Sequence, residues 1–326
     1  MHSLSNDKND GPLTPITKDN SMRNRREIMT VTGATALGFL ASSGTSFGKH
    51  PEAKTGLNST ANNAFKFKLS LAAYSYRQLL TGNKPELTLT DFIDDCAKFG
   101  LEGTELTSYY FPESPTPEFL YQLKSHSFRS GLDISGTAIR NDFGFADGTK
   151  REENISHVKK WIEYAEMMGT SVIRVFAGHQ KKGISEQETH RLMVAGFEEC
   201  CDYAGKHGVH LALENHGGPT ATADGLLKFV NDVKSDWFGV NLDTGNFHSK
   251  DIYGDLEKVA KHALNVQVKV VVSGPDKKKR PADFTRIAKI LRSANYRGYV
   301  VLEFEETGDP RIECPKYLNK LREVLK

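Results

Sequence analysis

The sequence predicts a single-domain α/β protein, a (β/α)8 TIM barrel formed by residues 65–326. Short β-rich runs alternate with amphipathic helical stretches eight times over about 260 residues, which is the usual size of such a barrel. Several predicted helices end in Gly directly before the next strand, and Gly suits the left-handed conformation that ends a helix. No Gly-rich phosphate-binding motif follows the first strand, where the rival fold, a doubly wound open sheet, often carries one.

The elements follow one another in the strand-then-helix order that a parallel sheet requires. The predicted strands begin near Lys68, Leu101, Leu132, Ser171, Val209, Phe238, Val266 and Tyr299. The predicted helices cover Leu89–Phe99, Glu118–Arg129, Arg151–Met168, Glu186–Lys206, Thr222–Val233, Leu256–Ala263, Ala282–Ser293 and Pro315–Leu325. The glycines predicted to end helices are Gly100, Gly131, Gly169, Gly208 and Gly298.

Residues 1–64 are predicted to lie outside the barrel, as a disordered N-terminus that carries an export signal and a linker. The pair Arg25 and Arg26 stands before a mildly apolar run, Val31–Ala41, and small residues follow. A charged start, a short apolar stretch and a small-residue end form a bacterial signal at about residues 22–48, and paired arginines are typical of the twin-arginine route. We therefore expect an exported, periplasmic protein; a basic tail on a cytoplasmic protein is the alternative.

The charge balance argues against some kinds of partner. The chain has 43 Lys and Arg residues and 41 Asp and Glu residues, which give a formal net charge of +2. Nucleic-acid binding usually needs a strongly basic face, so we expect no nucleic-acid partner. No stretch approaches the roughly 18 apolar residues of a membrane span, so no membrane contact is expected beyond the export signal. Assembly into a homo-oligomer is left open.

The last four predicted strands place polar side chains inside the barrel. Side chains alternate along a strand, and the apolar side of a barrel strand faces the helices. In the fifth strand Val209, Leu211 and Leu213 share the outward face. By the same alternation, the inward polar residues of strands five to eight are His210, Glu214, His216, Asn241, Asp243, Gln267, Lys269, Glu303 and Glu305. An unpaired buried charge costs several kcal/mol, so we expect a divalent cation to compensate these carboxylates.

Four segments carry a resemblance to a known family. They are Leu213–His216 (LENH), Asn241–Asn246 (NLDTGN), Val266–Lys269 (VQVK) and Gly298–Glu303 (GYVVLE). With them, the chain from Phe65 to Lys326 resembles the xylose-isomerase-like TIM-barrel superfamily of sugar phosphate isomerases and epimerases. In that family the ends of strands five to eight supply Glu, Asp, His or Gln, and Glu as ligands to one divalent metal. The resemblance implies that the ligands here are Glu214, Asp243, Gln267 and Glu303.

The ligand set bears on the choice of metal. Gln267 stands where the family more often has His, and its carbonyl is a hard, neutral oxygen donor. An all-oxygen set favours Mg²⁺ or Mn²⁺, with Zn²⁺ or Co²⁺ left open. The alternative reading is a set of buried polar residues that neighbours such as Lys269 stabilise without a metal.

The expected chemistry is proton transfer next to a sugar carbonyl. A metal that chelates adjacent carbonyl and hydroxyl oxygens stabilises the enediolate left when the C–H proton departs. Glu214 and Glu303 then form an acid/base pair, a role that the family resemblance also implies. The sequence thus predicts a divalent-metal-dependent sugar isomerase or epimerase with a small carbohydrate substrate.

Three other functions are alternatives for such a barrel. A keto-inositol or 3-keto-glycoside dehydratase or lyase would use the same metal site, and a non-catalytic carbohydrate-binding barrel would need no turnover. Endonuclease IV-type DNA repair belongs to the same superfamily, but it needs several zinc ions on many His ligands and a basic face, which this chain does not offer.

Further side chains are candidates for substrate contact, each with a structural role as the alternative. They are His216, Lys269, Glu105, Asn246 and His179, with Arg174 as a weaker candidate. The aromatic residues Tyr74, Tyr76, Tyr109, Tyr110 and Phe111 follow the first two strands and suit either stacking on a sugar or packing under loops. The basic run Lys277–Arg280 reads as a solvated loop, with phosphate binding on the catalytic face of the barrel as the alternative.

Overall fold

The computed structural model describes residues 66–326 of the chain. The predicted twin-arginine signal at about residues 22–48, and the linker that follows it, lie outside the described residues. Within residues 66–326, no helix combines the length and apolar character needed to cross a bilayer.

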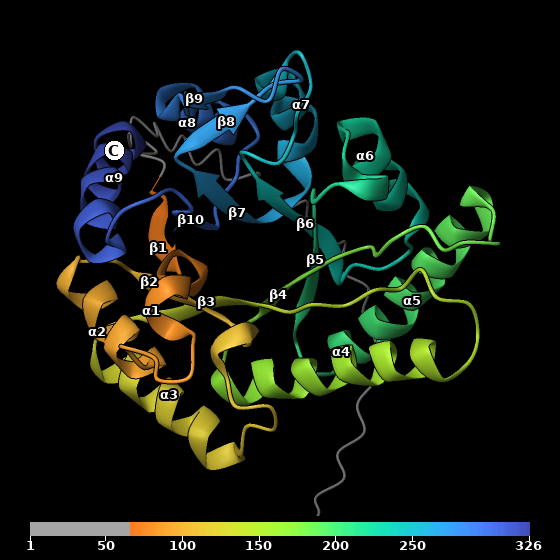
Figure 1. Cartoon of the computed structure of the whole chain (residues 1–326), viewed down its shortest axis with the longest axis horizontal. Helices are drawn as coiled ribbons and strands as arrows, with labels where there is room; N and C mark the ends of the chain where they lie inside the picture. The colour runs from red at the N-terminus through yellow and green to blue at the C-terminus, as the bar shows by residue number, and fades with distance from the viewer. Residues whose placement is uncertain (1–65) are drawn as a thin grey trace, which may run out of the picture. The chain divides into compact units, whose positions relative to one another are not determined.

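Eight parallel strands close into a barrel, which confirms the predicted fold class. Their order around the barrel is β1-β10-β7-β6-β5-β4-β3-β2. The bounds are β1 Lys68–Ala72, β2 Gly103–Thr107, β3 Asp133–Ala138, β4 Val172–Val175, β5 His210–Glu214, β6 Phe238–Asp243, β7 Ala263–Lys269 and β10 Tyr299–Glu303. Figure 1 shows the strands as a ring with the helices around its outside. All the C-terminal strand ends therefore meet at one mouth.

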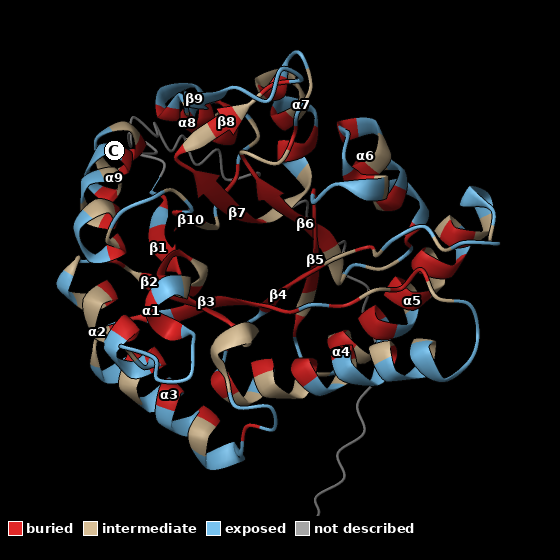
Figure 2. Cartoon of the chain, in the orientation of Figure 1, coloured by how far each residue is buried: buried red, intermediate tan, exposed pale blue. Residues whose placement is uncertain are grey.

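The helices form the outer layer. Their bounds are α1 Arg77–Leu80, α2 Leu89–Lys98, α3 Pro117–Arg129, α4 Thr149–Met168, α5 Glu186–Lys206, α6 Ala223–Asp232, α7 Ile252–Val259, α8 Phe284–Ser293 and α9 Pro310–Leu325. Figure 2 shows the strands of the barrel largely buried, and helices with one buried and one exposed side. Leu211, Leu213, Val266 and Val268 are fully buried in the layer between strands and helices, as the alternation predicts.

Local capping explains where several helices begin and end. Thr88 caps α2, because its side chain accepts a hydrogen bond from the backbone N–H of Asp91. The Asp91 side chain accepts a hydrogen bond from the backbone N–H of Thr88 in return, which completes a capping box. Gly169 has φ 78° at the end of α4, as expected for a helix-stop glycine. Gly298 has a different reason to be Gly, because a Cβ there would collide with the phenol of Tyr296.

Several elements differ from the predictions. Helix α7 covers Ile252–Val259 rather than Leu256–Ala263, and β7 begins at Ala263 rather than near Val266. Helix α9 begins at Pro310, where Asp309 caps it, so Pro315 lies inside the helix and does not start it. A hairpin that was not predicted, β8 Val271–Ser273 with β9 Lys279–Pro281, carries most of the basic run.

Candidate active site

The strand register brings the predicted interior residues to the same level at the barrel mouth. Glu214 on β5 lies opposite Asn241 on β6, and Asp243 on β6 lies opposite Gln267 on β7. Across the next strand pair, Lys269 on β7 lies opposite Glu303 on β10. The candidate residues are all buried: Glu214, Asp243, Gln267, Lys269 and Glu303.

Lys269 stands at the centre of an acidic cluster. Its Nζ lies 2.5 Å from Glu303 Oε2, 2.9 Å from Glu305 Oε1 and 3.3 Å from Asp243 Oδ2. Burial lowers the pKa of Lys269, but the three carboxylates outweigh burial and hold its pKa well above the ordinary value. Lys269 is therefore a charged ammonium that ties the ends of β6, β7 and β10 together.

Glu214 forms a second centre beside the first. Arg174 Nε from β4 lies 2.9 Å from Glu214 Oε2, and Asn246 Nδ2 donates to Glu214 Oε1 at 2.9 Å. Burial raises the pKa of Glu214 to about 7, against the opposing effect of the Arg174 charge. A carboxyl group with this pKa can both accept and donate a proton near neutral pH. Asp243, which is fully buried, also has its pKa raised well above the ordinary value, first by burial.

A layer of amides and one acid lies inside the barrel. Gln267 Nε2 donates to Glu105 Oε1 at 2.7 Å, which joins β7 to β2 across the barrel interior. Asn265 Nδ2 donates to Glu105 Oε2, and Asn241 Nδ2 donates to Gln267 Oε1. Burial, and then the charge of Glu303, raise the pKa of Glu105 to about 7, although the two amide donors oppose the rise. These contacts orient the Gln267 carboxamide.

A cavity of about 670 Å³ opens at the barrel mouth. The predicted site residues that line it are Glu214, Glu303, His216, Lys269, Asn246 and His179, together with Arg174 and Glu305. Asp243, Gln267 and Glu105 do not line this cavity and are at most 1% exposed. Glu105 thus contacts the Gln267 amide and not the cavity wall, whereas it was predicted to touch substrate.

The two histidines have different settings at the rim. The ring of His216 packs 4.6 Å from the ring of Phe176, measured between centroids. His179 is 81% exposed, and its Nδ1 lies 3.2 Å from Asp142 Oδ2. Asp142 also binds Lys181 Nζ at 2.5 Å, so one carboxylate anchors two side chains of the loop after β4. Both residues line the cavity at the barrel mouth.

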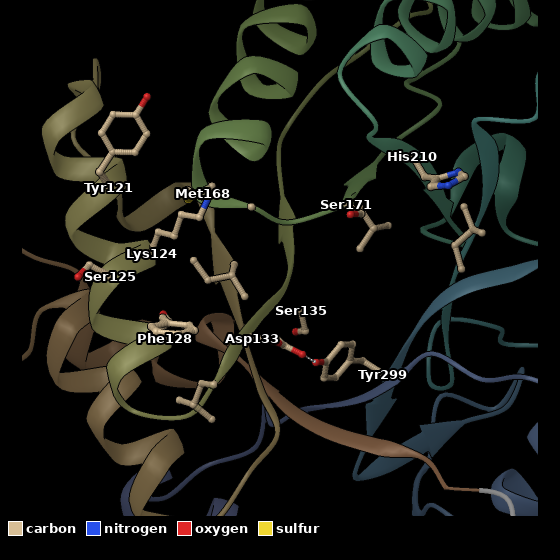
Figure 3. A pocket seen from close by; sticks show the side chains of 16 residues that line it. Tyr121, Lys124, Ser125, Phe128, Asp133, Ser135, Met168, Ser171, His210 and Tyr299 are labelled. Carbon is tan, nitrogen blue, oxygen red and sulfur yellow. Dashed lines mark hydrogen bonds between the residues drawn. The ribbon is translucent and has the colours of Figure 1, made fainter.

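A second cavity, of about 700 Å³, lies at the opposite end of the barrel. Figure 3 shows it between α3 and the first residues of β3 and β10, where Tyr299 OH donates to Asp133 Oδ2. Its wall includes Phe128, Met168 and Leu264, and it contains none of the predicted site residues. Catalytic residues in this fold come from the C-terminal strand ends, so the cavity at the mouth is the candidate active site.

The predicted metal ligands can be tested against this geometry. As the side chains stand, no three His, Cys, Asp or Glu residues within residues 66–326 are grouped to hold a metal ion. Lys269 lies between Asp243 and Glu303, and Arg174 engages Glu214. Two observations nevertheless fit a cation. Asp243 Oδ2 is buried and accepts no hydrogen bond from the described residues. The four carboxyl groups of Glu214, Asp243, Glu303 and Glu305 also outnumber the two basic groups beside them, Lys269 and Arg174. Hard oxygen donors in this number suit a dication.

Some residues of the site were missed or underrated by the sequence analysis. Arg174 was a weak candidate, although the alternation along β4 places it inside the barrel beside Glu214. Asn265 shares the inward face of β7 with Gln267, and this spacing of two could have identified it. Asp142 carried no local signal, because its partners come from a different loop.

Comparisons with known proteins agree with this architecture. A 26% identical match over 186 residues is L-ribulose-5-phosphate 3-epimerase of Escherichia coli K12, and it covers 54% of this chain. The match covers 66% of that relative, which is just under two thirds of its length.

Two solved structures share the fold at low identity. D-psicose 3-epimerase with D-tagatose from Clostridium cellulolyticum H10 has a TM-score of 0.66 at 18% identity, covering 80% of this chain and all of that one. The apo form of 3-keto-D-glucoside 4-epimerase from E. coli has a TM-score of 0.63 at 16% identity, covering 79% of this chain and all of the other.

The family itself is matched over most of the barrel. Residues 93–325, which are more than half of the chain, match the family described as Xylose isomerase-like TIM barrel. The closed parallel barrel agrees with that description. This chain belongs to the xylose isomerase-like TIM barrel family.

Proposed function

We propose that this protein is a divalent-metal-dependent sugar epimerase or isomerase that acts on a ketose. The observation that carries the proposal is the meeting of Glu214, Asp243, Lys269 and Glu303 at one barrel mouth, below a cavity of about 670 Å³. The matched relative from E. coli K12 is named as a 3-epimerase of a ketose phosphate, which supports the same reaction class.

The proposed metal ligands are Glu214, Asp243, Gln267 and Glu303, with Mg²⁺ or Mn²⁺ favoured by the all-oxygen set. A bound dication would supply Lewis-acid stabilisation of the negative charge that develops on the sugar oxygens. Within the protein, Glu105 and Asn241 hold the Gln267 carboxamide in place. We assign Glu105 this positioning role in place of the substrate contact expected from the sequence.

Glu214 and Glu303 are the proposed acid/base pair. Both line the cavity and come from strands on different sides of the mouth. Removal of a proton next to the carbonyl by one carboxylate, and return of a proton by the other from the opposite side, inverts the carbon. Arg174 and Asn246 each hold one oxygen of Glu214, which restrains the carboxylate in one orientation. Positioned groups of this kind contribute about 10² to 10⁴ in rate.

The remaining polar side chains of the cavity would bind the sugar hydroxyls. Lys269 carries a fixed positive charge beside the pair, Asn246 contacts Glu214, and His216 and His179 stand on the rim. An amide, an ammonium and two imidazoles offer both donors and acceptors, as hydroxyl groups need.

The test is metal analysis of the purified protein, followed by solvent-deuterium exchange across a panel of ketoses and keto-glycosides. We expect one divalent ion per chain and metal-dependent exchange at one carbon of at least one sugar. Sugar binding without exchange in the presence of Mg²⁺, Mn²⁺, Zn²⁺ and Co²⁺ would instead support a non-catalytic carbohydrate-binding barrel. Loss of water from a keto-sugar, with no epimer formed, would support a dehydratase.

A further inference from the structure

We infer that a groove beside the active-site cavity binds an anionic group, a phosphate or a carboxylate, at the far end of the sugar. This outer groove has a volume of about 530 Å³ and includes Tyr74, Arg77, Tyr109, Arg140 and His157. The inference rests on the proposed function, because it assumes that the reacting end of the sugar lies at Glu214 and Glu303.

The outer groove adjoins the active-site cavity. Tyr74, Tyr109 and Arg140 line both spaces. Tyr109 links this shared wall to the catalytic carboxylate: Arg174 Nη2 donates to the Tyr109 hydroxyl at 3.4 Å, and Arg174 in turn pairs with Glu214. A ligand that reaches past Tyr109 from the catalytic carboxylate therefore enters the outer groove.

The outer groove carries positive charge that no carboxylate of its own lining compensates. Its lining contains Arg77 and Arg140, and no Asp or Glu. In the catalytic centre Lys269 and Arg174 are paired with carboxylates, so the two arginines of the groove are the cations placed to attract an anionic end of a substrate. This difference would orient an anionic sugar with its charged end in the groove.

Arg140 is the residue we expect to bind the anion. Its guanidinium carbon lies 5.1 Å from the centroid of the Tyr109 ring, and the side chain is exposed. Among the residues that the structure describes, Arg140 has no carboxylate within ion-pair distance and no side-chain hydrogen bond. A planar guanidinium held against an aromatic ring can bind phosphate or carboxylate through two parallel hydrogen bonds.

Arg77 has a supporting position. Its guanidinium donates to the backbone carbonyls of Phe304 at 3.2 Å and Glu305 at 2.7 Å, and lies over the ring of Tyr74. These contacts tie the groove to the loop after β10 without neutralising the charge of Arg77. The groove therefore keeps a second, immobilised cation near Arg140.

The basic run on the β8–β9 hairpin is less suited to an anion. Lys279 Nζ contacts both carboxylate oxygens of Glu306, and Arg280 pairs with Asp276 at 2.6 Å. These acids neutralise two of the four charges of Lys277–Arg280. The sequence left open that this basic run binds phosphate. The outer groove is the better candidate for that role, because Arg140 there has no acidic partner in the described part of the chain.

The inference can be tested by titrating inorganic phosphate, and separately acetate, into the full-length protein in a calorimeter. We expect at least one anion to bind, and Arg140→Met to weaken that binding at least about tenfold, as expected for a lost charged contact. Arg140→Lys keeps the positive charge but loses the paired hydrogen bonds of the guanidinium. Its affinity for the anion should lie between that of the wild type and that of Arg140→Met. Preference for phosphate or for acetate tells which kind of anionic sugar the groove takes.

The control is Lys278→Met, which removes a charge from the basic run and should leave anion binding unchanged. The inference is overturned if neither anion binds, if Arg140→Met binds as tightly as the wild type, or if the loss appears in the control instead. This test is independent of the proposed function. If the protein catalyses no deuterium exchange on any ketose but binds phosphate through Arg140, the anion-binding groove is supported and the epimerase proposal is wrong.

Discussion

Arg174 Nε lies 2.9 Å from Glu214 Oε2, and both side chains are buried inside the barrel. Removing one partner of a buried ion pair leaves the other charge uncompensated, which typically costs about 3–5 kcal/mol. The pair therefore couples the stability of the barrel to the orientation of the proposed acid/base residue. Its two members come from adjacent strands, β4 and β5, whose register places Arg174 opposite Ala212.

The first prediction concerns the Arg174–Glu214 pair. Arg174→Met should lower the free energy of unfolding by as much as about 3–5 kcal/mol, because the buried Glu214 loses its compensating charge and must stay ionised without it or take up a proton. The double variant Arg174→Met with Glu214→Gln should recover part of this loss, since no charge then remains unpaired. Urea denaturation of the wild type and these two variants measures both effects. A double variant no more stable than Arg174→Met would contradict the coupling.

The second prediction concerns catalysis. Glu214→Gln and Glu303→Gln should each reduce metal-dependent deuterium exchange at least about a hundredfold, the low end for a lost acid/base group. Glu323→Gln, an exposed change on α9, is the matched control and should have no effect. An unchanged exchange rate in either active-site variant would remove that residue from the mechanism.

The third prediction concerns metal affinity. Lys269 is an internal cation that occupies the oxygens of Asp243 and Glu303. Lys269→Met should tighten Mn²⁺ binding at least about tenfold, because a nearby positive charge is removed from a buried site. Isothermal titration of Mn²⁺ measures the change, with the exposed Lys289→Met as control. Equal or weaker binding by Lys269→Met would show that Lys269 does not compete with the metal.

The fourth prediction concerns the pH dependence of the metal-free protein. The pKa of Glu105 and that of Glu214 rise from 4.5 to about 7 on burial. The folded state then binds more protons than the unfolded state between about pH 4.5 and 7, so stability falls as the pH rises through this window. Urea midpoints in EDTA at pH 5, 6 and 7 measure the fall. In Glu105→Gln the loss of stability between pH 5 and 7 should be smaller, because only Glu214 still contributes. An equally large loss in this variant would show that Glu105 is not a source of the pH dependence.

The fifth prediction concerns export, and it falls on residues outside the described part of the chain. Arg25→Lys combined with Arg26→Lys should leave the protein in the cytoplasm, because a twin-arginine signal depends on the pair. Cell fractionation and blotting measure the distribution. Normal appearance of the double variant in the periplasm would contradict the proposed signal.

Local patterns were enough to predict the barrel. Alternation along strands identified the inward faces of β5, β6, β7 and β10, and the number of strand-helix units matched a closed sheet. Boundaries were less well predicted where a cap decides them: Asp309 starts α9 five residues before the expected position at Pro315. A helix cap is one hydrogen bond between a side chain and a backbone N–H. Hydrophobic periodicity carries no information about such a bond, so it does not locate the first residue of the helix.

What the sequence determined by itself is which side chains face the inside of the barrel, because that depends only on the two-residue repeat of a strand. Which of these side chains touch one another was decided by the tertiary structure. Lys269 reaches three carboxylates, and Glu105 binds Gln267 from a strand 162 positions away in the chain. Such contacts depend on how the ring closes and on how buried charges find partners at atomic distances, and no local repeat encodes either.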